Sequence, residues 1–291
     1  MEQEAIVYHG KLEKYTYPCV VMNEDLLVKP LYIYIGDIEK SLLTGRIPIS
    51  KPVIIGSTGV GRILESKTSN SEFAGKIVTI SPFGKNGVLG VDRNGLLANY
   101  VSIDVSHVED FTPTPKPLDS LKPLLKHAVE LAKKAIEPVL VEGCGLIALL
   151  AGLVLDDLGL KPLFYCESNT RRISQFGFNV EKHLANVVKK WGSIIITSTE
   201  PSPKYKVLIN TEYKRVIISK LSFTNWLPLT GRPSEIHAFL VERGDSVEPT
   251  VIRSLADKLN RFIKVLDIER IDDALGLMPP QRLGYILSIK N

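Results

Sequence analysis

Apolar residues in the N-terminal third of the chain form short runs that glycine, proline and polar residues interrupt. Many short strands with such interruptions are typical of a barrel or sandwich domain. We therefore predict a strand-rich, barrel-like first domain. The expected strands are residues 5–8, 26–29, 53–55, 62–65, 76–80 and 98–103.

The pattern changes after a proline-rich segment, residues 112–117, which we expect to be a stiff, extended linker. Beyond it, nearly continuous apolar runs alternate with helical patterns. This alternation predicts a parallel sheet that helices cover on both faces. The expected strands of this sheet are residues 138–141, 163–166, 193–197 and 215–219, and the expected helices are residues 121–135, 146–158 and 251–262. The chain closes with a further strand at residues 284–289.

The strongest chemical motif is the sequence GCGLIA at residues 143–148, which lies between an expected strand and an expected helix. This context makes G-x-G-x-x-A a dinucleotide-binding turn. Gly143 permits the tight turn, Gly145 lets the backbone approach a pyrophosphate, and Ala148 allows close helix–strand packing. The helix N-terminus, starting at Leu146, offers N–H groups to the phosphates. The alternative is a glycine turn that serves packing alone.

A carboxylate follows the second strand of this unit. Glu167 lies 22 positions past Gly145 and can accept a hydrogen bond from a ribose 2′-hydroxyl. Arg171 and Arg172 could instead hold a 2′-phosphate, or form the solvated first turn of a helix. Because the carboxylate lies at the strand end, where the ribose binds, the sequence slightly favours NAD over NADP.

Composition narrows the class of protein. The net charge is +4, and lysine and arginine are scattered rather than gathered in a basic stripe, which argues against nucleic-acid binding. The longest apolar run, residues 144–155, is too short to span a bilayer. Cys19, Cys144 and Cys166 are odd in number, and their spacing matches no disulfide or metal framework. We therefore expect a reducing, cytoplasmic compartment and no membrane partner.

Several further segments follow one another in a recognisable order. Residues 27–39 precede Gly45 and Pro48, and residues 52–61 are similar to P-x-I-L-G-H-E-x-x-G. Residues 89–101 are similar to L-G-x-x-x-D-G-x-x-A-E-Y-V. With the helix from Lys122, the glycine turn and the C-terminal segment, this series resembles the medium-chain dehydrogenase/reductase family of the zinc alcohol dehydrogenase type.

The resemblance implies an architecture. It places a GroES-like catalytic domain at residues 1–120 and 265–291, and a Rossmann-type dinucleotide-binding domain at residues 121–264. The last strand, residues 284–289, is expected to return to the first domain. The segment between Ile173 and Ile194 is short for the family, which suggests a reduced nucleotide domain. Members of this family often form homodimers through the nucleotide-domain sheet.

The departures from the family concern zinc. The zinc cysteine falls on Gly36, or on Ile35 if the alignment slips by one position, and neither residue binds a metal. The family's four-cysteine structural lobe is absent, and residues 83–87 bridge its place. The remaining ligand and proton-relay positions carry Ser57-Thr58, Lys122-Pro123 and Ile38. The resemblance therefore implies a protein without zinc.

Two functions fit these observations. The first is a zinc-independent NAD(P)-dependent oxidoreductase that acts on a small carbonyl, enone or quinone substrate. The hydroxyls of Ser57, Thr58 and Tyr32 could then hydrogen-bond a carbonyl oxygen, although Ser and Thr beside glycine commonly bond the local backbone. The second is a non-catalytic relative that binds a nucleotide or a protein partner.

Overall fold

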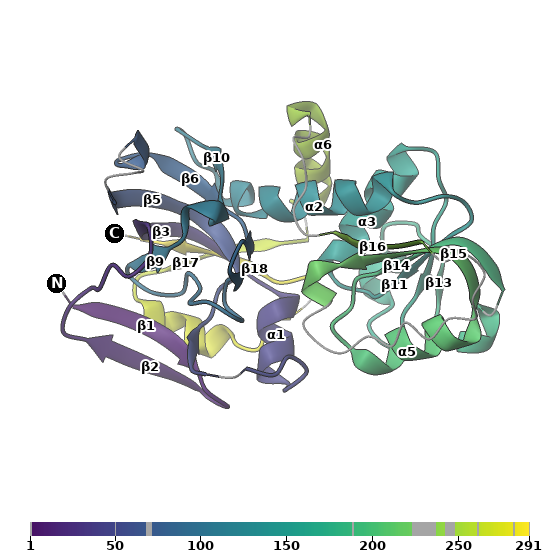
Figure 1. Ribbon diagram of the computed structural model, residues 1–291, viewed down its shortest axis with the longest axis horizontal. Coiled ribbons are helices and arrows are strands. Elements are labelled where there is room, and N and C mark those ends of the chain that lie inside the picture. Colours follow the sequence, from purple (N-terminus) through teal and green to yellow (C-terminus); the bar gives the residue numbers. More distant parts are fainter. Residues whose placement is uncertain are drawn as a thin grey trace. The chain divides into compact units, whose positions relative to one another are not determined.

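The computed structural model describes residues 2–49, 51–67, 72–187, 189–222, 237–241, 248–260, 262–281 and 283–290. The chain forms two compact units (Figure 1). Unit 1 contains Met1–Pro123 and Ala256–Asn291, and unit 2 contains Leu124–Leu255. Each unit is described by itself below.

Unit 1 is built on an antiparallel, strand-rich sheet. Its described strands run in the order β10-β6-β5-β3-β18-β17, and β9 also pairs with β3. The strands are β3 (Leu26–Ile35), β5 (Thr58–Ser66), β6 (Ile77–Ile80), β9 (Val101–Ile103), β10 (Val108–Phe111), β17 (Lys264–Ile268) and β18 (Tyr285–Ile289).

The C-terminal strand β18 belongs to this sheet, as the sequence predicts. It pairs antiparallel with β3, where Tyr285 lies opposite Ile35, and parallel with β17. Its residues Ile286 and Leu287 are almost completely buried. The two ends of the chain therefore build one domain together, and the expectation of a strand-rich first domain is confirmed.

Smaller elements complete unit 1. A second sheet has the order β2-β1-β4, and β7 and β8 form a short hairpin. The sequence analysis did not predict the strands β2, β7, β8, β10 and β17 or the helix α1. These elements are β1 (Gln3–Tyr8), β2 (Leu12–Tyr17), β4 (Val53–Ile54), β7 (Phe83–Gly84), β8 (Gly87–Val88), α1 (Asp37–Leu43) and the 3₁₀ turns η2 (Val105–His107), η3 (Pro117–Leu121) and η6 (Ile271–Leu277).

Unit 2 contains the predicted parallel sheet. Its described strands have the order β13-β12-β11-β14-β15-β16. The order reverses at β11, and ligands of such sheets bind at this switch point, beyond the carboxyl ends of the strands. The strands are β11 (Val139–Glu142), β12 (Leu163–Tyr165), β13 (Val180–Glu181), β14 (Lys190–Ile196), β15 (Glu212–Ser219) and β16 (His237–Val241).

The helices that accompany this sheet include the α3 expected after the glycine turn. They are α2 (Lys122–Lys133), α3 (Leu146–Asp157), α4 (Arg171–Ser174), α5 (Pro201–Asn210) and α6 (Pro249–Leu259), with the 3₁₀ turns η4 (Leu184–Asn186) and η5 (Lys220–Ser222). The sheet keeps six strands in the described residues. The shortening that the sequence suggests is confined to the segment between β12 and β14, where α4 is one turn and β13 has two residues.

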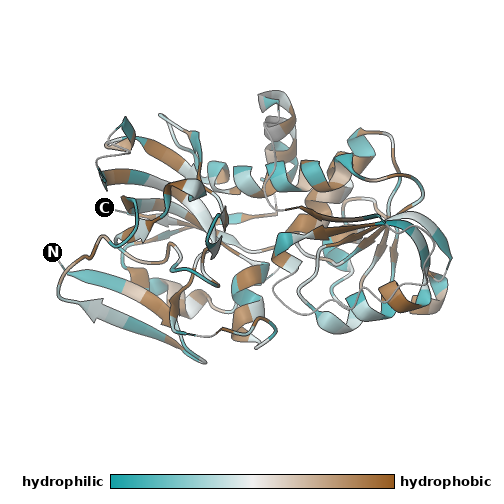
Figure 2. Ribbon diagram, viewed as in Figure 1, coloured by the Kyte–Doolittle hydropathy of each residue, from teal (hydrophilic) through white to brown (hydrophobic). Residues whose placement is uncertain are grey.

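Apolar residues cover both faces of the parallel sheet, which explains its nearly continuous hydrophobic strands (Figure 2). On one face, α3 is buried from Leu146 to Leu155, and a side chain at Gly152 would collide with the Phe164 ring. On the other face, Tyr165, Trp191 and residues of α5 pack into one cluster. The helices therefore hold the strand ends at fixed positions.

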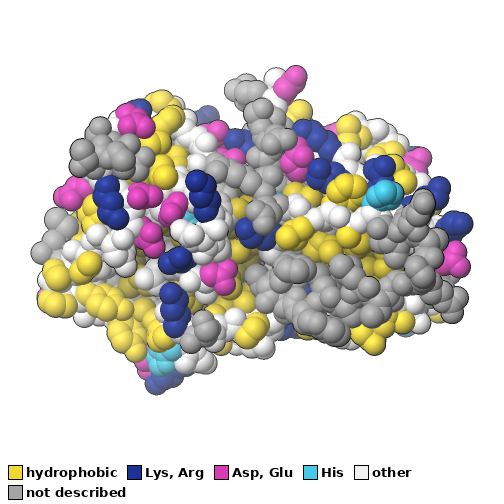
Figure 3. Space-filling model, viewed as in Figure 1, with side chains coloured by type: hydrophobic (Ala, Val, Ile, Leu, Met, Phe, Trp, Pro, Cys, Tyr) yellow, Lys and Arg dark blue, Asp and Glu magenta, His cyan; other side chains and the backbone are white. Residues whose placement is uncertain are grey.

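One face of the molecule carries charges of both signs. On the face drawn in Figure 3, lysine and arginine side chains alternate with acidic ones. Within the described residues, no helix is long and apolar enough to cross a membrane.

Candidate functional site

The glycine turn joins β11 to α3 at the switch point of the parallel sheet. Gly143 has a φ of +119°, and a side chain there would collide with the Thr197 hydroxyl and the Ser198 backbone nitrogen. Only glycine fits this position. Gly145 is the N-cap of α3 and has an extended backbone, with φ −90° and ψ −175°. The turn therefore directs the positive end of a buried helix toward the carboxyl edge of the sheet.

The predicted ribose carboxylate, Glu167, follows β12 and is already paired. Its Oε1 atom accepts hydrogen bonds from Lys206 Nζ at 2.6 Å and from the Tyr165 hydroxyl at 2.9 Å. The hydrogen bond from Lys206, more than that from Tyr165, holds the pKa of Glu167 below its ordinary value of 4.5. The side chain is 32% exposed, so solvent weakens the pair. Lys206 also brings a positive charge next to Glu167, which the sequence analysis did not predict.

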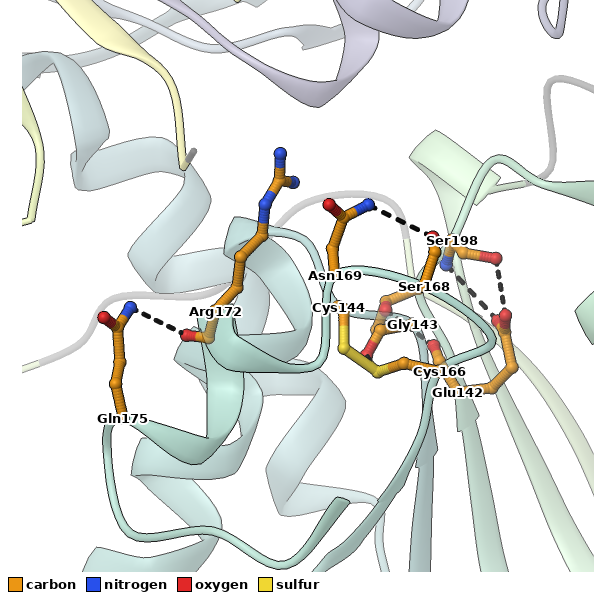
Figure 4. The surroundings of a disulfide bond; sticks show 10 residues. Glu142, Gly143, Cys144, Cys166, Ser168, Asn169, Arg172, Gln175 and Ser198 are labelled. Carbon is orange, nitrogen blue, oxygen red and sulfur yellow. Dashed lines mark hydrogen bonds between the residues drawn. A yellow bond between two sulfur atoms is a disulfide. The ribbon is translucent and has the colours of Figure 1, made fainter. Parts of the chain in front are cut away.

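The two arginines lie on the one-turn helix α4, close along the chain to Glu167. Arg171 is exposed and Arg172 is half-buried. The preceding Asn169 has a φ of 58°, and its amide donates to the Ser168 hydroxyl at 3.1 Å. Figure 4 shows the Arg172 and Asn169 side chains extending in the same direction. This arrangement adds positive charge beside the carboxyl end of β12.

A disulfide joins Cys144, the residue between the two glycines, to Cys166, the residue before Glu167 (Figure 4). The two Cα atoms are 5.8 Å apart. The prediction that the cysteines form no disulfide is therefore wrong. The two residues are 22 positions apart, but the adjacent parallel strands β11 and β12 bring their ends together. Cys19 is an exposed free cysteine.

A buried acid lies directly before the glycine turn and was missed in the sequence. Glu142, the last residue of β11, is 1% exposed and accepts a 2.6 Å hydrogen bond from the Ser198 hydroxyl. Burial raises its pKa to about 7, although Ser198 and the positive charge of Lys204 act in the opposite direction. A glutamate that ends an apolar strand beside a glycine turn is the signal that could have found it.

Lys204 is the buried basic partner of this acid. Its side chain lies in α5, is 1% exposed, and donates to the Ser222 carbonyl at 2.9 Å. Burial lowers its pKa to about 8, while the charge of Glu142 raises it. The switch point thus contains two buried ionisable groups whose pKa values lie near neutrality.

The residues predicted for the reacting end of a substrate lie in unit 1. Thr58 is fully buried, and its hydroxyl lies 2.8 Å from the Ile80 carbonyl, to which it donates. Ser57 is also buried, and its N–H donates to Glu39 Oε1 at 3.0 Å. Tyr32 lies on β3 opposite Val60 and is half-buried. Of the three predicted hydroxyls, the one on Tyr32 therefore belongs to the most exposed residue.

The Tyr34 ring fills the space beside Gly36, the position that the sequence analysis aligned with the family's zinc cysteine. A side chain at Gly36 would collide with the ring of Tyr34, which is buried and whose hydroxyl donates to the Leu283 carbonyl at 2.6 Å. The Gly36 N–H donates to Glu39 Oε2 at 2.7 Å. Glu39 is thus a positioning residue that holds positions 36 and 57 together, and burial raises its pKa.

These residues do not fit a zinc ion. Glycine and serine stand at two of the expected ligand positions, and at the third Lys122 pairs with Asp119 at 2.9 Å. A zinc site needs thiolate, imidazole or carboxylate groups that converge on one centre. In the part of the chain that the structure describes, no group of three or more such side chains could hold a metal ion.

Comparison with family models and with curated proteins finds no match to this sequence. Solved structures do match. Acetophenone reductase from Geotrichum candidum, solved with NAD, has a TM-score of 0.71 at 13% identity, with 99% of this chain and 97% of that chain covered. A Sinorhizobium meliloti protein bound to NADP has a TM-score of 0.70 at 16% identity, with 99% of both chains covered.

A third similar structure is 2R,3R-butanediol dehydrogenase from Bacillus subtilis, with a TM-score of 0.70 at 14% identity, covering 99% of this chain and 100% of that one. These identities are too low to transfer an activity. They show that the whole chain has the fold of the zinc-type medium-chain dehydrogenases, which confirms the resemblance seen in the sequence at the level of fold.

Proposed function

We propose that this protein is a zinc-independent NAD(P)-dependent oxidoreductase that transfers a hydride to or from a small carbonyl, enone or quinone. The observation that carries the proposal is the glycine turn at the switch point. Gly143 adopts a conformation reserved for glycine, and α3 begins immediately after the turn. This turn lies at the switch point of the sheet, beyond the carboxyl ends of the strands, where dinucleotides bind in sheets of this kind.

The dinucleotide would be held by unit 2. Gly143, Gly145 and the helix N-terminus at Leu146 would bind the pyrophosphate, and Ala148 keeps the helix close to the strand. Glu167 would accept a hydrogen bond from the adenosine ribose. The nicotinamide, when bound, supplies the hydride chemistry, and the protein supplies binding, orientation and exclusion of water.

We propose only a slight preference for NAD over NADP. Glu167 would repel a 2′-phosphate, but Lys206 offsets its charge. Arg171 and Arg172 add further positive charge at the same edge. These charges are partly exposed, so each contributes little by itself.

At the reacting end, we propose that hydroxyls rather than a metal contact the substrate oxygen. Ser57, Thr58 and Tyr32 remain the proposed group, and Tyr32 is the leading member because the Thr58 hydroxyl donates to a backbone carbonyl. A conjugated substrate suits such a site, since hydrogen bonds can stabilise the oxyanion that hydride addition produces. We propose a homodimer with no nucleic-acid or membrane partner.

We propose a cytoplasmic location on the family resemblance alone. The cysteine count no longer supports it, because Cys144 and Cys166 form a disulfide.

Nucleotide binding tests the proposal. Titration with NADH and NADPH, followed by tryptophan fluorescence or calorimetry, should give saturable binding. Gly145→Val should abolish it, because the side chain would occupy the space of the phosphates. Gly276→Val is the matched control, since a side chain there meets nothing within 4 Å. If the wild type binds neither nucleotide at millimolar concentration, the oxidoreductase proposal is wrong.

The second candidate is a non-catalytic relative that binds a nucleotide or a protein partner. The observation that favours it is the short segment between β12 and β14 of the nucleotide domain, where α4 is one turn and β13 has two residues. This candidate predicts nucleotide binding without turnover of any enone, quinone or carbonyl substrate, or no nucleotide binding at all.

A further inference from the structure

The Cys144–Cys166 disulfide lies in the part of unit 2 that would bind the nucleotide. Cys144 is the middle residue of the glycine turn, and Cys166 immediately precedes Glu167. One bridge therefore fixes the separation between the pyrophosphate turn and the strand end that carries the ribose carboxylate (Figure 4). Neither hydride transfer nor the fold by itself requires a redox-sensitive bond at this position.

Hydrogen bonds hold the start of the turn in addition to this bond. The Gly143 N–H donates to the Tyr165 carbonyl at 3.1 Å, and the Thr197 N–H and hydroxyl donate to the Glu142 carbonyl at 3.1 and 2.7 Å. These contacts tie the start of the turn to both neighbouring strands. Cys166 Sγ also lies 3.2 Å from the Gly143 carbonyl oxygen, which a thiol at Cys166 could reach as a weak donor. Reduction should loosen the turn without unfolding unit 2.

The two cysteine residues differ in exposure. Cys166 is 4% exposed, whereas Cys144 is half-buried. An incoming thiolate can therefore reach Cys144 more easily than Cys166. Attack on Cys144 Sγ would release Cys166 as a thiolate and form a mixed disulfide at Cys144.

We propose that Cys144 and Cys166 form a redox-active site that exchanges with dithiols and sets the affinity of the adjacent nucleotide site, an inference that rests on the proposed function. A dithiol reductant donates two electrons. Its first thiolate forms the mixed disulfide with Cys144, and its second thiolate breaks that bond. The products are the oxidised, cyclic disulfide of the reductant and two protein thiols. The two protons that the reductant's thiols lose are taken up by Cys144 and Cys166.

The oxidised form should bind the nucleotide more tightly, because the disulfide holds the turn near one arrangement and less conformational freedom is lost on binding. We expect reduction to raise the Kd for NADH by about three- to tenfold.

Coupling between the two events must be reciprocal. If oxidation tightens nucleotide binding by a given factor, saturating nucleotide must disfavour reduction of the disulfide by the same factor. A disulfide that only stabilises the fold would raise the unfolding temperature and show no such coupling.

The experiment uses the full chain with Cys19→Ser, which removes the exposed free thiol. Folded protein is incubated with dithiothreitol, and thiols are counted by alkylation and mass measurement. The count should rise from none to two, and the Kd for NADH should increase. The same chain with Cys144→Ser and Cys166→Ser should bind NADH like the reduced form and should not respond to dithiothreitol.

Two results would overturn the inference. One is a disulfide that becomes reducible only in denaturant. The other is a Kd for NADH that is the same in both redox states. Failure of the proposed function gives a different result, because then neither redox state binds NADH, whatever the thiol count shows, and the proposed regulation is lost with it.

Discussion

The buried carboxyl of Glu142 should make the stability of the protein depend on pH, and Glu142→Gln should remove that dependence. Burial raises the pKa of Glu142 from 4.5 to about 7 in the folded protein. Between these two values the unfolded chain releases a proton that the folded chain keeps. The contribution of Glu142 to the free energy of unfolding is therefore fully present below pH 4.5, and it is lost as the pH rises through 7.

The magnitude follows from the size of the pKa shift. One pKa unit corresponds to about 1.4 kcal/mol, so ionisation of Glu142 costs the folded state on the order of 3 kcal/mol above pH 7. Glutamine keeps an oxygen that can accept the 2.6 Å hydrogen bond from Ser198 and does not ionise. Relative to the wild type, the variant should gain about 2 to 3 kcal/mol between pH 4.5 and pH 7.5.

Titration of Lys204 sets the upper limit of the pH range over which the effect of Glu142 on stability can be measured. Its folded pKa is lowered to about 8, so its contribution to stability is present above its ordinary pKa of 10.5 and is lost as the pH falls through 8. Below pH 7, where Glu142 is mostly uncharged in the folded wild type, Lys204 has no charged partner at position 142 in either protein and affects the two stabilities alike. The comparison should therefore end near pH 7.5.

Urea unfolding at 25 °C in steps from pH 4.5 to pH 7.5 measures the effect. Glu212→Gln, which replaces an exposed carboxyl at the start of β15, is the control and should follow the wild type. If the free energies of unfolding of wild type and Glu142→Gln run parallel over this range, then Glu142 is not the buried, neutral acid described here.

Three further predictions test single features. Lys206→Ala should weaken NADPH binding more than NADH binding, by about two- to fivefold in the ratio of the two Kd values, because it leaves Glu167 without its ion-pair partner; equal changes would contradict the role of that pair. Tyr32→Phe should lower kcat by about tenfold or more and leave the Kd for NADH unchanged; an unaltered kcat would exclude the Tyr32 hydroxyl. Elemental analysis of protein purified without a metal tag should find well under one zinc per chain; stoichiometric zinc that survives dialysis would show that the assignment of Gly36 and Ser57 to the ligand positions is wrong.

The sequence predicted those elements whose conformation depends on neighbouring residues, such as the glycine turn and the apolar strands. The turn at residues 143–148 is readable because Gly143 needs its special backbone and because a strand and a helix flank it. Apolar runs likewise revealed β11, β12 and β14, which are buried on both faces. The short edge strand β2 was missed because none of its residues is buried and its pattern is mostly polar.

The chemistry around the turn depends on contacts between distant residues, and sequence spacing does not reveal these. Lys206 reaches Glu167 from a helix 39 positions away, and Cys144 meets Cys166 only because β11 and β12 are neighbours. Tyr34 provides a similar example in unit 1. Its ring fills the space beside Gly36, so the position of the missing cysteine is closed by a residue that the family alignment did not single out.

Turnover in the presence of a metal chelator tests the central claim most directly. Oxidation of NADH and NADPH is followed by absorbance with a panel of quinones, enones and small carbonyl compounds. A zinc-independent oxidoreductase should oxidise at least one nucleotide at a rate that the chelator leaves unchanged and that Gly145→Val abolishes. Nucleotide binding without turnover of any substrate in the panel, or turnover that the chelator eliminates, would contradict the account.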